Sequence, residues 1–134
     1  MSREVLIVDD DTDFVETTEI VLRSNGYLTR TAFNGEEALK RILEKTPDII
    51  LLDIMMKTKG DGIWVSEQIR LNESIKNIPI IMITAVNQDA DMLKYHFERS
   101  AGPDSNYIPV NVFMEKPIEI EDLLAEIKNL LAAP

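Results

Sequence analysis

Several short apolar runs in this chain end at polar residues, and this pattern limits the fold more than any other feature of the sequence. The runs cover residues 5–8, 49–52, 80–83 and 112–115. Runs this short, rich in β-branched residues and apolar on both faces, are typical of buried parallel strands. The polar residues at their ends are Asp9, Asp10, Asp53, Thr84 and Lys116. Because a ligand binds outside the carboxyl ends of the strands in an open α/β sheet, we expect these side chains to converge there.

The segments between the runs have the apolar spacing of helices. Residues 14, 18, 21 and 22 follow helical spacing until Asn25-Gly26 ends the pattern. Asn34, with Glu37 three residues later, forms a capping box that predicts a helix over 36–44, with residues 39, 42 and 43 facing inward. Further helices are expected over 63–71 and 88–99.

The clearest helix is expected near the carboxyl end of the chain. Residues 120, 123, 124, 127 and 131 form one apolar stripe at helical spacing. With a weaker strand at 27–31, the pattern predicts a (βα)5 fold, a parallel sheet with helices on both faces.

Length and composition favour one domain spanning residues 1–134. A chain of 134 residues is near the commonest domain size, and its 45% hydrophobic content argues against disorder. No apolar run is long enough to cross a bilayer and no signal sequence precedes the first strand, so we expect a cytoplasmic protein without membrane insertion. The absence of cysteine excludes disulfide and thiolate chemistry.

The charge of the chain bears on what it binds. A net charge of −10 disfavours direct nucleic acid binding, which draws on clustered Lys and Arg. Acids at positions 9, 10, 11 and 13 would repel one another and Asp53 unless a cation were bound, so the cluster indicates a metal site. For Asp11 and Asp13, the simpler interpretation is that they favour the amino end of the following helix.

This arrangement resembles the receiver domain of two-component response regulators, over about Glu4 to Leu131. The resemblance implies a doubly wound, flavodoxin-like sheet with strand order 2-1-3-4-5. It also implies that Asp53 is the phosphoryl acceptor, and that Thr84 and Lys116 contact the phosphoryl group. Lys116-Pro117 is similar to the Lys-Pro pair of the family, which implies a cis peptide bond.

The metal and the switch follow from the same resemblance. Mg²⁺, or Mn²⁺ in its place, prefers oxygen ligands. We expect Asp10 and Asp53 to bind it directly, Asp9 to act as an outer partner, and the Met55 backbone carbonyl to complete the set as the family implies. Thr84 and Phe113 occupy the positions of the switch residues.

The resemblance also implies the partners. The phosphoryl donor would be a sensor histidine kinase or a histidine phosphotransfer protein, and an effector would bind the surface of the fourth helix, fifth strand and fifth helix. The chain would thus be a phosphorylated signalling protein and not an enzyme in the ordinary sense. Met55 and Val86 stand where the family flanks the attacking water, and because neither can orient water, we predict slow autodephosphorylation.

Two stretches depart from the family pattern. The loop after Asp53 carries Lys57 where proline is expected and has one extra residue, so Lys57 or Lys59 could reach toward the acids. Residues 99–109 contain Gly102-Pro103 and Asn106-Tyr107, which are turn signals. They predict an inserted loop before the fifth strand, beside the expected output surface.

Three other functions remain open. A phosphohydrolase of the haloacid dehalogenase type fits residues 9–12, but it leaves Asp53 unexplained and the chain has no room for a cap domain. A calcium loop starting at Asp9 needs Gly and Glu where Phe14 and Ile20 stand. A phosphorylation-independent interaction module is the nearer alternative, and phosphate labelling would separate it from a receiver.

Overall fold

A computed structural model describes residues 2–54, 56, 62–84 and 110–132 of the chain. Its strands are β1 (Glu4–Val8), β2 (Leu28–Ala32), β3 (Ile49–Asp53), β4 (Ile80–Thr84) and β5 (Val112–Glu115). Its helices are α1 (Thr12–Ser24), α2 (Gly35–Glu44), α3 (Gly62–Leu71) and α5 (Ile120–Ala132). The strands form one parallel sheet in the order β2-β1-β3-β4-β5, which confirms the predicted fold. The predicted helix at 88–99 and the predicted insertion at 99–109 lie outside the described residues.

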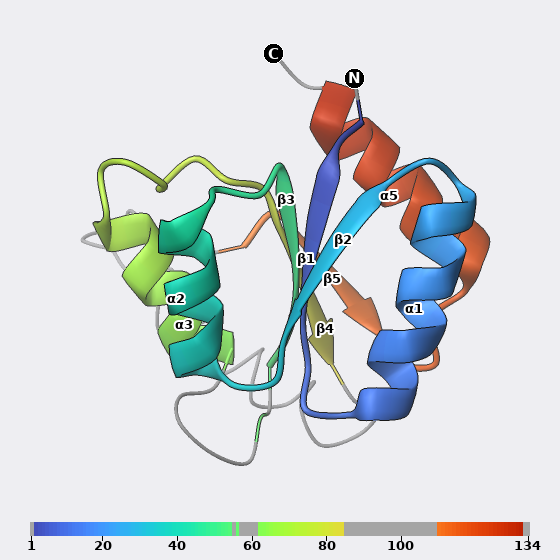
Figure 1. Cartoon of the computed structure of the whole chain (residues 1–134), viewed down its shortest axis with the longest axis horizontal. Coiled ribbons are helices and arrows are strands. Elements are labelled where there is room, and N and C mark those ends of the chain that lie inside the picture. The colour runs from blue at the N-terminus through green and yellow to red at the C-terminus, as the bar shows by residue number, and fades with distance from the viewer. Residues whose placement is uncertain (1, 55, 57–61, 85–109, 133–134) are drawn as a thin grey trace, which may run out of the picture.

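Helices cover both faces of the sheet (Figure 1). α2 and α3 lie on one face, and α1 and α5 lie on the other. Because successive strand side chains point to opposite faces, Leu6 and Val8 pack into the core under α2 and α3, while Val5 and Ile7 pack under α1 and α5. Every residue of β1, β3 and β4 is therefore buried, which explains their continuous apolar runs.

The edge strand β2 has a weaker sequence signal because only one of its residues is fully buried. Ala32 is inaccessible to solvent, whereas Leu28 is 51% exposed. Thr29, Arg30 and Thr31 give the middle of the strand a polar character. The strand forms nevertheless and pairs in register with β1. It begins and ends one residue later than predicted.

The helices begin where the caps indicated, but two inward-facing predictions were wrong. The Asn34 side chain accepts a hydrogen bond of 2.8 Å from the Glu37 N–H and caps α2. α2 buries Ala38 and Ile42, so Leu43, which is turned about 100° from Ile42 around the helix, is 65% exposed. Ile120, at the first turn of α5, is likewise exposed.

The carboxyl-terminal helix is held to the sheet by the middle of its apolar stripe. Leu123 and Ile127, one turn apart, are fully buried against the core that α1 also covers. Within the described parts of the chain, we find no helix with both the length and the apolar character needed to span a bilayer.

Candidate functional site

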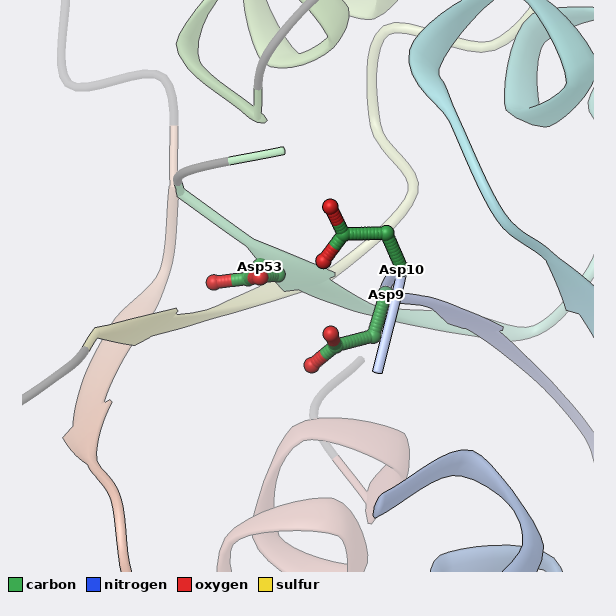
Figure 2. Close-up of side chains that lie close together, drawn as sticks. All are labelled: Asp9, Asp10 and Asp53. Atoms are coloured by element: carbon green, nitrogen blue, oxygen red, sulfur yellow. The ribbon is translucent and has the colours of Figure 1, made fainter. Parts of the chain in front are cut away.

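The three acids that the sequence singled out lie together at the carboxyl edge of the sheet. Asp9 and Asp10 directly follow β1, and Asp53 is the last residue of β3, its neighbour in the sheet. Figure 2 shows their carboxylates pointing to the same side of the strand ends. One oxygen from each lies within 4.8 Å of the others. Asp9 and Asp53 are buried and Asp10 is partly buried, so the cluster is largely shielded from water.

Backbone contacts fix the orientation of Asp9. Its N–H donates to the Ala32 carbonyl at 3.1 Å, which extends the pairing of β1 with β2. Its Oδ1 accepts from the Asp11 N–H at 2.9 Å. Asp11 in turn caps α1, because its side chain accepts from the N–H groups of Asp13 and Phe14. The helix-capping interpretation of Asp11 is therefore confirmed, and Asp13 lies in the first turn of α1.

Lys116 brings a positive charge to the acids. It follows β5, and its N–H donates to the Thr84 carbonyl at 2.7 Å. Its Nζ lies 2.8 Å from Asp9 Oδ2 and 4.5 Å from the centre of the Phe14 ring. The peptide bond to Pro117 is cis, as the resemblance implied.

The surroundings of Lys116 keep it protonated. Burial alone would lower the pKa of the ammonium, but the contact with Asp9 and the negative charges of Asp9, Asp53 and Asp11 outweigh burial and raise this pKa above the ordinary lysine value. At neutral pH, Lys116 is therefore a fixed positive charge beside the acid cluster.

Gly62 packs directly against the backbone of Asp53. Its N–H donates to the Ile54 carbonyl at 3.0 Å. A Cβ at position 62 would lie 2.2 Å from the Asp53 carbonyl oxygen and 2.8 Å from Ile54 Cα. Only glycine fits this approach, so Gly62 sets the position of the end of β3. Gly62 is a functional residue that the strand-end pattern does not reveal; its signal in the sequence is a glycine at the start of the helix that follows Asp53.

Thr84 and Phe113 lie on the same face of the sheet. Thr84 ends β4 and is 2% exposed, and its hydroxyl donates to the Met114 carbonyl at a long 3.5 Å. Phe113 pairs in register with Met82 of β4 and packs against the core under α2 and α3. Thr84 follows Met82 by two residues and therefore points to that same face. The Met55 carbonyl, Val86, Lys57 and Lys59 fall outside the described residues, so their predicted roles stay predictions.

The acid cluster fits a divalent cation that prefers oxygen. Asp9 Oδ2 is buried and, among the described residues, accepts no regular hydrogen bond; its compensation is the ion pair with Lys116. Oxygens on opposite sides of Mg²⁺ are about 4.2 Å apart. Carboxylate oxygens already within 4.8 Å of one another would need only small side-chain movements to bind such an ion.

The chain is similar in sequence to known proteins. The family model of the response regulator receiver domain matches residues 5–128. The chain is 32% identical over 127 residues to the DNA-binding dual master transcriptional regulator RpaA of Synechocystis, covering 95% of this chain and 48% of that protein. It is 34% identical over 131 residues to the alkaline phosphatase synthesis transcriptional regulatory protein PhoP of Bacillus subtilis, covering 98% of this chain and 49% of that protein.

A solved structure extends this agreement to three dimensions. The crystal structure of a putative response regulator from Chloroflexus aurantiacus superposes with a TM-score of 0.82 at 32% identity, covering 99% of this chain and 100% of that one. The chain spans about half the length of the two curated relatives. Because the family match runs from the first strand into the last helix, the chain belongs to the receiver domain family of two-component response regulators.

Proposed function

We propose that this receiver takes a phosphoryl group onto Asp53 from a phosphohistidine of a sensor kinase or phosphotransfer protein. The proposal depends chiefly on one observation: Asp53 ends its strand beside Asp9 and Asp10, with their carboxylate oxygens within 4.8 Å. A carboxylate attacks a phosphoryl group poorly, because both are negatively charged. A site for this reaction must therefore gather positive charge around the carboxylate.

The acid cluster would supply part of that charge by holding Mg²⁺. Asp10 and Asp53 would be its direct ligands, Asp9 an outer partner, and the Met55 carbonyl a further ligand. When bound, the ion would neutralise the acceptor and the phosphoryl oxygens. Asp9 is held by the Asp11 N–H and Lys116, so the chain presents its carboxylate in a fixed orientation.

The rest of the charge would come from Lys116, which stays protonated and lies next to the acids. In the transfer, an Asp53 oxygen forms the new P–O bond while the P–N bond of phosphohistidine breaks, and the imidazole leaves with the electron pair. No proton needs to leave Asp53, since its carboxylate is the nucleophile. The site would therefore work by positioning and electrostatic stabilisation.

Phosphorylation would then be transmitted through Thr84 and Phe113. The 3.5 Å hydrogen bond from Thr84 to Met114 is weak, so turning the hydroxyl toward a phosphoryl oxygen loses little. Phe113 lies on the same face and would repack as Thr84 moves. The result is a two-state element biased by a local charge, with an effector binding at the surface of β5 and α5.

The wider setting follows from the family. We propose that the protein acts in the cytoplasm, where a kinase can reach it, and that its net charge of −10 keeps this chain from binding DNA by itself. Met55 and Val86 would leave the attacking water without a hydrogen-bonding side chain, so the phosphorylated state would decay slowly.

Intact mass measurement after incubation with acetyl phosphate and Mg²⁺ tests the acceptor. We expect one added phosphoryl group on the wild type and none on Asp53→Asn. Asp48→Asn is the matched control, because Asp48 lies at the opposite edge of the sheet, bonded to the Glu4 N–H, and this variant should label like the wild type. Labelling of Asp53→Asn at the wild-type level would show that the acceptor is elsewhere. A folded wild type that does not label would favour the phosphorylation-independent module.

A further inference from the structure

The Phe14 ring contacts Lys116, which also forms the ion pair with Asp9. Phe14 lies in the first turn of α1, whereas Lys116 follows β5, so the contact joins distant parts of the chain. The lysine Nζ is 4.5 Å from the ring centre. A cation this close to an aromatic face is attracted by the negative charge of the ring surface. Lys116 thus has a second anchor besides Asp9.

The two anchors differ in what happens to them during the proposed reaction. Asp9 belongs to the set of acids that would hold Mg²⁺, and the ammonium of Lys116 must turn from Asp9 toward the phosphoryl oxygens on Asp53. A lysine side chain has several rotatable bonds, and a free one loses considerable entropy each time it is ordered. The Phe14 ring neither binds the metal nor accepts the phosphoryl group, so this contact can persist throughout.

We propose that Phe14 is a positioning residue, whose ring face keeps the Lys116 ammonium within reach of the phosphoryl group on Asp53. This role rests on the proposed function of Asp53. The plainer interpretation is that Phe14 only packs beside α5. Phe14 and Lys116 indeed line a cavity of about 630 Å³ together with apolar residues that include Ile118, Ile120 and Leu123.

Three variants separate the effect of the aromatic face from the effect of side-chain bulk. Phe14→Leu keeps an apolar side chain but removes the aromatic face, and Phe14→Tyr keeps the face. Ile120→Val is the matched control, because Ile120 lines the same cavity from α5. The measurement is the dissociation constant of beryllofluoride, a phosphoryl mimic, in the presence of Mg²⁺. We expect Phe14→Leu to bind it about two- to fivefold more weakly, with wild-type affinity in the other two variants.

A spectroscopic measurement tests the contact without any phosphoryl chemistry. Protons of the Lys116 side chain next to Nζ should be shifted upfield by the ring current in the wild type and in Phe14→Tyr. The shift should vanish in Phe14→Leu.

Stepwise fluorination of Phe14 weakens the negative ring face with little change of shape, and should weaken beryllofluoride binding in the same steps.

The outcomes distinguish the positioning role from the function on which it rests. Wild-type beryllofluoride affinity in Phe14→Leu, or affinity unchanged by fluorination, would overturn the positioning role and leave Asp53 as the acceptor. A wild type with ring-shifted Lys116 protons that binds no beryllofluoride would overturn the proposed function, and the positioning role with it.

Discussion

Both ends of the parallel sheet hold carboxylates beside basic side chains, but the carboxylates are arranged differently at the two ends. At the amino end, Glu4 is 7% exposed, and both of its carboxylate oxygens face a cation. Oε1 lies 2.8 Å from Arg30 Nε and Oε2 lies 3.4 Å from Lys45 Nζ. Arg30 also donates to the Arg41 and Lys45 carbonyls near the end of α2, so this group ties β1, β2 and α2 together.

At the carboxyl end, three acids lie close to one another and a lysine lies beside one of them. Asp9, Asp10 and Asp53 gather within 4.8 Å, and Lys116 forms an ion pair with Asp9. Carboxylates this close repel one another, and a bound divalent cation would offset that repulsion. The two clusters therefore differ in arrangement. The Glu4 carboxylate lies between two basic side chains and stabilises the fold, whereas the three carboxylates at the other end lie beside one another, as the proposed metal site requires.

The largest expected effect comes from breaking the close backbone packing at the carboxyl end. Gly62→Ala would place a methyl group 2.2 Å from the Asp53 carbonyl oxygen, so the backbone of Asp53 must shift. We expect a loss of about 3 kcal/mol in unfolding free energy and strongly reduced labelling by acetyl phosphate. Chemical denaturation and intact mass measure the two effects.

Gly26→Ala provides the comparison. Gly26 lies just after α1 with a φ of 90°, and a Cβ there would meet no neighbouring atom, so alanine adds strain without a clash. We expect a loss of about 1 kcal/mol and labelling like that of the wild type. Equal losses of labelling in the two glycine variants would show that Gly62 has no specific role in positioning Asp53.

Much of the fold could be predicted because burial on both faces leaves a simple signature. β1, β3 and β4 are apolar at nearly every position, and each ends at, or directly before, a polar residue of the site. Parallel strands bring those ends to one edge, so the grouping of Asp9 with Asp53 followed from strand order alone. The inward face of α2 was less certain, because one residue of rotation around a helix separates the buried Ile42 from the exposed Leu43.

The contacts between distant side chains could not be predicted in the same way. The pairing of Glu4 with Arg30 depends on the β1–β2 register. The contact of Phe14 with Lys116 depends on how α1 packs beside the end of β5. Neither leaves a pattern in the sequence, because each is set by packing in three dimensions. The role of Gly62 depends on a backbone approach of the same kind.

The second largest expected effect is a change in unfolding free energy, with opposite signs for substitutions at the two ends of the sheet. Glu4→Gln removes the charge that compensates Arg30 and Lys45, and we expect a loss of about 2 kcal/mol in unfolding free energy, below the range for fully buried pairs because Lys45 is exposed. Asp10→Asn relieves repulsion among the acids, so without Mg²⁺ it should gain about 1 kcal/mol.

Magnesium sharpens this second test. At ten times its dissociation constant, Mg²⁺ should stabilise the wild type and Glu4→Gln by about 1.4 kcal/mol, and should leave Asp10→Asn nearly unchanged. Denaturation curves with Mg²⁺ and with a chelator measure both effects. If both variants destabilise the protein without Mg²⁺, repulsion among the acids at the carboxyl end does not limit the stability of the fold and the comparison fails.

The smallest expected effect is a dependence of stability on pH at the carboxyl end. Asp9 and the other acids raise the pKa of Lys116 above its value in the unfolded chain, which is about 10.4. A raised pKa stabilises the fold fully at pH values below the pKa of the unfolded chain, and this contribution disappears as the pH rises through the pKa of the folded state.

The difference in unfolding free energy between the wild type and Lys116→Met should therefore stay constant from about pH 6 to pH 9, and narrow above about pH 10. In an Asp9→Asn background, where burial of Lys116 is less well opposed, its pKa should be raised less, so the narrowing above about pH 10 should be smaller. Denaturant titrations across this range decide the matter, and a difference that already shrinks between pH 6 and pH 9 in the wild-type background would contradict the assignment of Lys116 as a fixed charge.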